Sequence, residues 1–286
     1  MELRHKAKAE GRLSYILREE MGMSLSLMNK LKWDDRLRVN GIPCHTDYPV
    51  KPGNLVTAEL PDSAPEYPAE DGPLDILYED DHFLAVDKPA GMLIHPSRAC
   101  FTGTLANFVL GYYRKTGQDS AFHPITRLDR DTFGVVLLAK NPHIHALMMA
   151  ALRENALKKT YYAYVWGKPD AEGVIDAPIA RREPPSLLRY VDDSGKVCLT
   201  TYRRLKAWDK YSLLELHPIT GRTHQLRVHC AYIGHPILGD VQYGNEEVLA
   251  LSKELGFTTQ ALCAGKLEFT HPKTGQEICL ESSCSL

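Results

Sequence analysis

Two carboxylates and two guanidiniums stand directly in front of an apolar run in the segment Arg-Leu-Asp-Arg-Asp, residues 127–131. The apolar residues that follow, 135–139, have the composition of a buried strand. Neighbouring Arg and Asp side chains usually form exposed ion pairs that contribute little to stability. A carboxylate at the mouth of a core strand can instead do chemistry as a nucleophile or a base. This segment alone leaves both interpretations open.

The acids of this segment, Asp129 and Asp131, suggest at first the paired carboxylates of a glycosidase. Residues two apart on a turn do not face each other across a substrate, so we interpret Asp131 as a turn or surface group. A nucleoside hydrolase would need a second positioned carboxylate or a calcium-binding aspartate cluster, and the sequence suggests neither. No metal site is expected either, because four histidines lack a companion acid or cysteine at ligand spacing, namely His217, His224, His229 and His235.

The composition is that of a globular protein and argues against several classes. Hydrophobic residues make up 44% of the 286 residues and charged residues 24%. No apolar run reaches the length of a membrane span, and the first residues lack the apolar core of a secretory signal. The 7 cysteines are scattered without a C-x-x-C pair, which argues against a disulfide framework or a zinc ribbon and fits the cytoplasm. The net charge of −2 argues mildly against nucleic acid, although only the binding face needs positive potential.

The chain divides into three zones. Residues 1–60 predict a small α/β domain, with helical spacing around Leu13 to Leu17, a second short helix, and strands in LRVNGIP and NLVTAEL. Residues 61–73 contain prolines and acids without periodicity, which predicts an extended linker. Residues 74–286 form the third zone.

Strands and helices are mixed in the third zone without a regular βαβ rhythm. This order predicts an α+β fold rather than a doubly wound sheet. Apolar runs predict strands around 77, 83–86, 92–95, 135–139, 159–167 and 211–218, and helical spacing predicts helices over 105–115, 143–155 and 223–234.

Five motifs in order give a sharper expectation, because together they are far more specific than any one alone. They are DKPAGMLIHP (87–96), TRLDRDTFGVVLLAKN (126–141), KTYYAYVWG (159–167), ITGRTHQLRVHCAYIGHPILGDVQYG (219–244) and LCAGKLEFTHPKTG (262–275). Their order and spacing resemble the RluA family of pseudouridine synthases over essentially the whole third zone. The first zone resembles the α-L RNA-binding domain carried by many of these enzymes. The resemblance implies a mixed, largely antiparallel central sheet flanked by helices, and isomerisation of uridine in RNA.

The resemblance also implies roles for individual residues. Asp129 falls on the essential catalytic aspartate, acting as nucleophile or base, and Arg222 falls on the arginine expected to pair with it. That cation would keep the carboxylate ionised in a desolvated site. Tyr161 falls on the active-site tyrosine, which can stack on uracil and handle the proton on carbon 5. Arg127 is expected to fill the stack that a flipped uridine leaves, with a simple structural arginine as the alternative.

The resemblance implies RNA as the binding partner, with ribosomal RNA favoured over transfer RNA. Contacts of the first zone with phosphates are expected from Lys30, Lys32, Arg36 and Arg38, unless these are a solvated helix face. We expect no cofactor, metal or membrane, and a monomer. A non-catalytic RNA-binding protein with the same fold is the alternative from another class. Departures from the family pattern at Thr126 and Phe133 put substrate choice in doubt more than the reaction.

Overall fold

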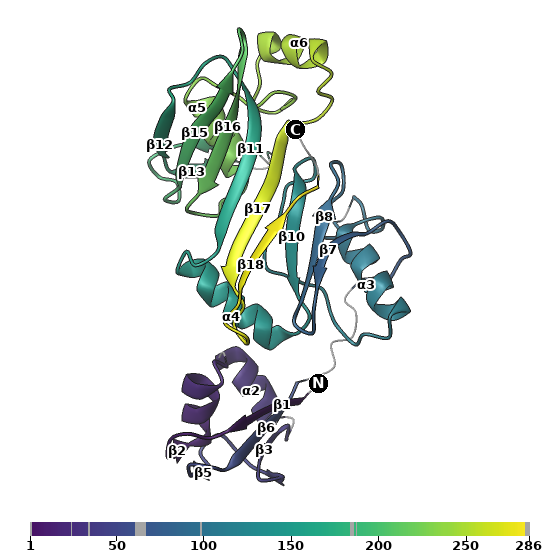
Figure 1. The fold of residues 1–286 in the computed structure, drawn as a ribbon, viewed down its shortest axis with the longest axis vertical. Helices are drawn as coiled ribbons and strands as arrows, with labels where there is room; N and C mark the ends of the chain where they lie inside the picture. The colour runs from purple at the N-terminus through teal and green to yellow at the C-terminus, as the bar shows by residue number, and fades with distance from the viewer. Residues whose placement is uncertain are drawn as a thin grey trace.

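The computed structural model describes residues 2–283 apart from residues 24, 34, 61–66, 98, 184, 185 and 187. Its elements fall into a front unit at the N-terminal end and a larger body built on one sheet (Figure 1). The first part of the expected linker, residues 61–66, lies outside the described residues.

The front unit, residues 2–60, has a hydrophobic core of its own. Leu13, Leu31 and Val56 are fully buried in that core, which draws all its members from residues 3–60. Four strands form a sheet in the order β1-β6-β3-β4, and a second pair joins β2 to β5. The elements are β1 (Glu2–Lys6), β2 (Gly11–Arg12), α1 (Leu13–Tyr15), the π-helix η1 (Ile16–Glu20), α2 (Leu25–Trp33), β3 (Leu37–Val39), β4 (Ile42–Pro43), β5 (Pro49–Val50) and β6 (Leu55–Glu59).

The larger body is organised around a ten-stranded mixed sheet whose main path runs β12-β15-β16-β11-β17-β10-β8-β7. Among its described strands only β10 and β17 pair in parallel, so the expected α+β fold with a largely antiparallel central sheet is confirmed. The strands are β7 (Asp75–Glu79), β8 (Phe83–Lys88), β9 (His123–Pro124), β10 (Phe133–Ala139), β11 (Lys158–Trp166), β12 (Glu172–Asp176), β15 (Leu199–Ala207), β16 (Tyr211–Pro218), β17 (Leu262–Thr270) and β18 (Glu277–Glu281).

In the described part of the chain, four helices accompany this sheet, together with the separate strand pair β13 (Ile179–Arg181) and β14 (Arg189–Val191). The helices are α3 (Leu105–Lys115), α4 (Pro142–Arg153), α5 (Gln225–Tyr232) and α6 (Glu246–Glu254). Asn141 begins α4 by accepting a hydrogen bond from the backbone N–H of Ile144, and the side chains of Thr104 and Asn107 cap α3 reciprocally.

Strand β10 is buried on both faces, which explains its unbroken apolar run. Val135 and Leu137 belong to a core that α4 completes, whereas Val136 and Leu138 belong to a core that α3 completes. The charged segment 127–131 therefore stands directly before a strand that is enclosed on both faces.

The strand expected at 92–95 is not formed. The carbonyl groups of Leu93 and Ile94 accept hydrogen bonds from the first N–H groups of α3, and the carbonyl of Met92 accepts one from the buried ammonium of Lys88. Because these acceptors are already used, the segment joins a helix start and not a sheet.

Residues 67–72, which the sequence assigns to the linker, pack against α3. The side chain of Asn107 donates to the carbonyl of Pro68, and Glu70 donates its N–H to the carbonyl of Asn107. A Cβ on Gly111 would stand 1.9 Å from the carbonyl oxygen of Glu70, so only glycine admits this approach. The segment is therefore attached to the larger body.

Candidate active site

The loop that carries Asp129 is anchored on both sides. Before it, Ile125 donates its N–H to the carbonyl of Leu137, and the N–H of Leu137 donates to the hydroxyl of Thr126. After it, Nζ of Lys88 donates to the carbonyl oxygen of Arg130 at 2.9 Å. Thr126, which departs from the family pattern, therefore stabilises the loop through its hydroxyl group.

The following residues fix the loop against β17. The amide of Gln260 donates to the hydroxyl of Thr132, and both side chains are buried. Gly134 has φ +112, and a Cβ there would stand 2.3 Å from the carbonyl oxygen of Ala264. A side chain at 134 would push β10 away from its parallel neighbour, so the glycine lets the two strands meet.

Asp129 forms an ion pair with Arg227 of α5. Nη1 of Arg227 donates to Oδ2 of Asp129 at 3.1 Å, and the two side chains are 7% and 26% exposed. One oxygen of the carboxylate is therefore held by a nearly buried cation while the group as a whole stays accessible. Such an arrangement can present an ionised carboxylate to a substrate.

Arg227 is itself oriented by other groups. Asp240, only 1% exposed, accepts two hydrogen bonds from it, from Nε at 2.7 Å and from Nη2 at 2.8 Å. The amide oxygen of Gln242 accepts a further one from Nη2 at 2.6 Å. Burial opposes the charge of Arg227, but the hydrogen bonds and charges of Asp240 and Asp129 outweigh it and raise the pKa of the guanidinium.

The expected pairing of Arg222 with Asp129 is wrong. Arg222 is exposed, and its Nε donates to the backbone carbonyl of Val197 at 3.2 Å. It lies in the loop before α5, whereas Arg227 lies inside the helix beside Leu226, which packs on the sheet. The two arginines are five residues apart in one motif, and the helix presents only the second to the carboxylate.

Tyr161 approaches the same point from β11. Phe133 of β10 and Tyr162 of β11 both lie opposite Cys263 of β17, so these three residues are aligned across neighbouring strands. The pairing of β11 with β17 shifts register between Thr160 and Tyr162, which gives Tyr161 a bulge position. Burial, aided by the charge of Asp129, raises the pKa of the Tyr161 phenol far above its usual range.

Side chains of β11 alternate between two hydrophobic cores. Tyr161 packs with Ala163 and Val165 against Leu226, while Tyr164 and Trp166 belong to a core on the other side. Helix α5 therefore supports Tyr161 through Leu226 and brings the next residue, Arg227, to Asp129.

The remaining charges of the segment face solvent. Arg130 donates to both carboxylate oxygens of Asp131, at 3.0 and 3.1 Å, which is the surface pair that the sequence predicts for Asp131. The side chain of Arg127 is exposed beside the site.

The four histidines considered as metal ligands each have other partners. His229 lies between Thr200 and the carbonyl of Ala177, and Nδ1 of His235 donates to the carbonyl of Trp166. His217 contacts Glu215, and His224 contacts Tyr243. Within the described ranges, no three side chains of His, Cys, Asp or Glu gather as a metal site would require.

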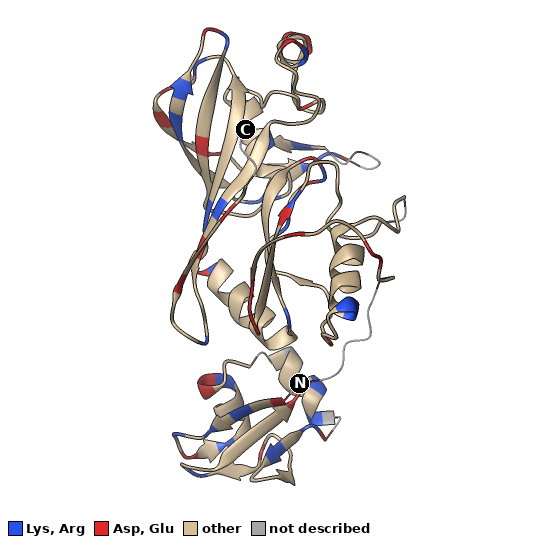
Figure 2. Ribbon diagram, turned by 45° about the vertical axis from the view of Figure 1, so that its right-hand side comes forward, with Lys and Arg blue, Asp and Glu red and all other residues tan. Residues whose placement is uncertain are grey.

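The basic residues expected to bind phosphate differ in their surroundings. Lys30 is exposed, whereas Lys32, Arg36 and Arg38 are half-buried. The guanidinium of Arg36 donates to the carbonyl of Leu60 and lies 3.9 Å from the carboxylate of Glu59. Basic and acidic segments are interspersed in the front unit (Figure 2).

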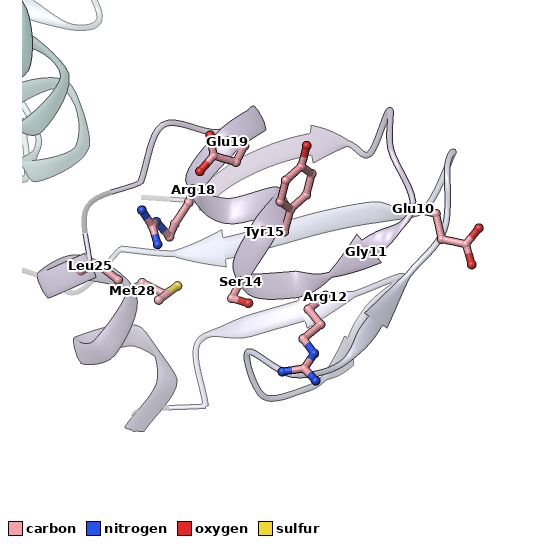
Figure 3. A pocket seen from close by; sticks show the side chains of 9 residues that line it. All are labelled: Glu10, Gly11, Arg12, Ser14, Tyr15, Arg18, Glu19, Leu25 and Met28. Carbon is pink, nitrogen blue, oxygen red and sulfur yellow. The ribbon is translucent and has the colours of Figure 1, made fainter.

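The front unit also holds an open pocket of about 440 Å³ between its first helical turns and α2 (Figure 3). Its charges are balanced, since two arginines and two glutamates line it around the half-exposed Tyr15. The lining residues are Glu10, Gly11, Arg12, Ser14, Tyr15, Arg18, Glu19, Leu25 and Met28.

Comparison with known proteins agrees with this geometry. Residues 82–232 match the family model described as RNA pseudouridylate synthase. The chain is 36% identical over 263 residues to an uncharacterized RNA pseudouridine synthase of Bacillus subtilis, YjbO, covering 91% of this chain and 90% of that protein. It is also 36% identical over 257 residues to ribosomal large subunit pseudouridine synthase D of Zymomonas mobilis, covering 86% of this chain and 77% of that protein.

Among solved structures, the human RNA pseudouridylate synthase domain containing 1 superposes with a TM-score of 0.60 at 25% identity. That match covers 77% of this chain and 92% of the human chain. The chain belongs to the RNA pseudouridylate synthase family, as the resemblance to RluA-family enzymes predicts, and its activity is isomerisation of uridine in RNA. In the described part of the chain, no helix combines the length and apolarity needed to cross a membrane.

Sequence reasoning missed the groups that position Arg227. Asp240 and Gln242 stand in the GDVQYG motif, thirteen and fifteen residues after the arginine. The sequence did carry one signal, because Arg227 is flanked by Leu226 and Val228 in a predicted helix, which indicates a buried arginine. A buried guanidinium requires a carboxylate partner, so an acid such as Asp240 could have been sought.

Proposed function

We propose that this enzyme isomerises uridines of large-subunit ribosomal RNA and that Asp129 is its catalytic carboxylate. The observation that carries the assignment is the accessible carboxylate of Asp129, held through one oxygen by the buried Arg227. The choice of RNA is supported by the relatives named ribosomal large subunit pseudouridine synthase D.

The reaction needs one group of this kind. The bond between nitrogen 1 of uracil and the sugar breaks, the base turns, and carbon 5 bonds to the same sugar carbon. Carbon 5 loses its proton, and nitrogen 1 gains one, so atoms balance without a cofactor. Asp129 serves either by attacking the anomeric carbon or by removing the neighbouring sugar proton.

Arg227, and not Arg222, is proposed as the cation that holds the carboxylate of Asp129 in place. Tyr161 is proposed to stack on the uracil while keeping its own proton, because its raised pKa makes the phenolate unfavourable beside Asp129. A protonated phenol can donate to the base as it turns but cannot accept the proton of carbon 5. Arg127 is exposed beside these groups, and we propose that it fills the stack vacated by the flipped uridine.

The front unit is proposed to add affinity for structured RNA through phosphate contacts. Lys30 and Arg38 are the clearest candidates because Arg36 lies near Glu59 and bonds Leu60. Phosphate contacts of this kind depend on salt and not on sequence.

Release of tritium from carbon 5 tests the proposal. Unmodified large-subunit ribosomal RNA and a pool of transfer RNA transcripts, both labelled at carbon 5 of uridine, are incubated separately with the protein. We expect tritium release from the ribosomal RNA alone, with no free uracil. Release from transfer RNA alone would reassign the substrate, and free uracil would indicate hydrolysis.

A further inference from the structure

Tyr243 contacts both side chains that face Oδ2 of Asp129. Its ring lies 5.0 Å from Cζ of Arg227, and its hydroxyl lies 2.8 Å from Nδ1 of His224. The same hydroxyl accepts a hydrogen bond of 3.0 Å from the backbone N–H of Arg189, in β14. Contacts from β14 and from α5 with its N-cap residue therefore hold this tyrosine beside the catalytic carboxylate.

These contacts favour the tautomer of His224 that carries its hydrogen on Nε2. Because the N–H of Arg189 can only donate, the hydroxyl oxygen of Tyr243 is the acceptor there, and its own proton is available for Nδ1 of His224. The neutral imidazole then carries its hydrogen on Nε2, which lies 3.9 Å from Oδ2 of Asp129. The reverse tautomer would turn a lone pair toward the carboxylate, which is unfavourable.

The backbone at His224 is also unusual. Its φ of 58 and ψ of 18 are left-handed, immediately before α5 begins at Gln225. A non-glycine residue in this region is strained, and the conformation persists where surrounding contacts determine it. Here that conformation places the imidazole between Tyr243 and Asp129.

The charges around His224 come from several elements. Asp129 lies in the loop before β10, Arg227 on α5, Arg189 on β14 and Asp240 in the loop after α5. Burial is the largest influence and lowers the pKa of His224, with Arg227 and Arg189 acting in the same direction and the two aspartates opposing it. The balance of these influences favours the neutral imidazole.

We propose that Tyr243 is a positioning residue that locks His224 as an uncharged second donor to Asp129. This rests on the proposed role of Asp129. Arg227 supplies the positive charge that pairs with Asp129. When bound substrate shields the site from water, Nε2 of His224 moves closer and donates its hydrogen to the same carboxylate oxygen. A neutral donor orients the carboxylate without the loss of nucleophilicity or basicity that a second cation would cause.

The substitution Tyr243→Phe removes only the hydroxyl. His224 can then adopt the tautomer with the hydrogen on Nδ1, which directs a lone pair at Asp129. We expect the single-turnover rate of tritium release from large-subunit ribosomal RNA to fall about tenfold near pH 8, with RNA affinity within about twofold. As the pH falls below the lowered pKa of His224, protonation of its imidazole restores the hydrogen on Nε2. The ratio of variant to wild-type rate should therefore rise toward one.

The substitution His224→Asn keeps a residue type that tolerates the left-handed backbone but removes the imidazole. It should lose a similar factor in rate without recovery at low pH, and the double variant should be no slower than His224→Asn alone. Tyr112→Phe is the matched control, because the hydroxyl of Tyr112 donates to Glu79 at 2.5 Å, outside these contacts. Its rate ratio to the wild type should be independent of pH.

A spectroscopic readout separates this proposal from the proposed function. Nitrogen-15 spectra of histidine-labelled wild-type protein without RNA should show His224 neutral with its hydrogen on Nε2, and Tyr243→Phe should change that signal. A hydrogen on Nδ1 in the wild type would overturn the proposal, as would a pH-independent rate ratio for Tyr243→Phe. Full activity of Asp129→Asn would instead overturn the proposed function, whatever the tautomer.

Discussion

Oδ2 of Asp129 accepts a hydrogen bond of 3.1 Å from Arg227, a residue 98 positions further along the chain. The pair joins the loop before β10 to helix α5, so it exists only when the two halves of the sheet have come together. The groups around it place the guanidinium more firmly than the pair alone would, because Asp240 accepts from two of its nitrogens.

Exchanging the two arginines of the motif for lysine tests which of them serves Asp129. Arg227→Lys keeps the charge but cannot reach Asp129 and Asp240 together, so we expect the single-turnover rate to fall about a hundredfold. Arg222→Lys should stay within about twofold of the wild type. The account of the ion pair fails if Arg222→Lys is the slower variant.

Lys88 predicts an unusual dependence of stability on pH. Burial, opposed by the charges of Asp131 and Asp129, lowers the pKa of this ammonium from 10.5 to about 8. Between those pH values the unfolded chain binds more protons than the native one, so native stability rises with pH. Below about pH 8 the ammonium is charged in both states, and the cost of burying it is fully present.

Urea unfolding from pH 7.5 to pH 10 measures this effect against Lys88→Met. We expect the free energy of unfolding of the wild type to rise relative to the variant by up to about 3 kcal/mol across the window. The variant loses three hydrogen bonds to carbonyl groups at every pH, so only the difference in slope is informative. Parallel curves would show that the native ammonium titrates normally.

The front unit should be removable without unfolding the larger body. Since residues 67–72 pack on α3, the shortened chain should begin at Tyr67 rather than at Leu74. We expect it to keep its rate at saturating RNA but to bind structured RNA more weakly, with a shallower slope of log affinity against log salt. Equal slopes for the full and shortened chains would mean that the front unit makes no phosphate contacts.

The sequence predicted those elements whose signal is local. The apolar run of β10 and the helical spacing of α4 are such signals, and motif resemblance placed Asp129 and Tyr161 on the loop and strand that meet at the site. Prediction from the sequence failed where tertiary contacts determine the local structure. At 92–95, the carbonyl groups of a strand-like segment accept hydrogen bonds from α3 and Lys88 instead of from a neighbouring strand. Arg222 and Arg227 illustrate the same limit, since only the packing of α5 on β11 and β16 selects between them.

The central claim is that the carboxylate of Asp129 performs the isomerisation. Asp129→Asn keeps the shape and one oxygen for Arg227 but cannot act as nucleophile or base at neutral pH. Single-turnover tritium release from labelled large-subunit ribosomal RNA, with affinity measured on the same RNA, tests this directly. We expect no release above background while affinity stays within about threefold of the wild type, because a neutral isostere leaves the binding surface intact. Release at the wild-type rate by Asp129→Asn would contradict the account.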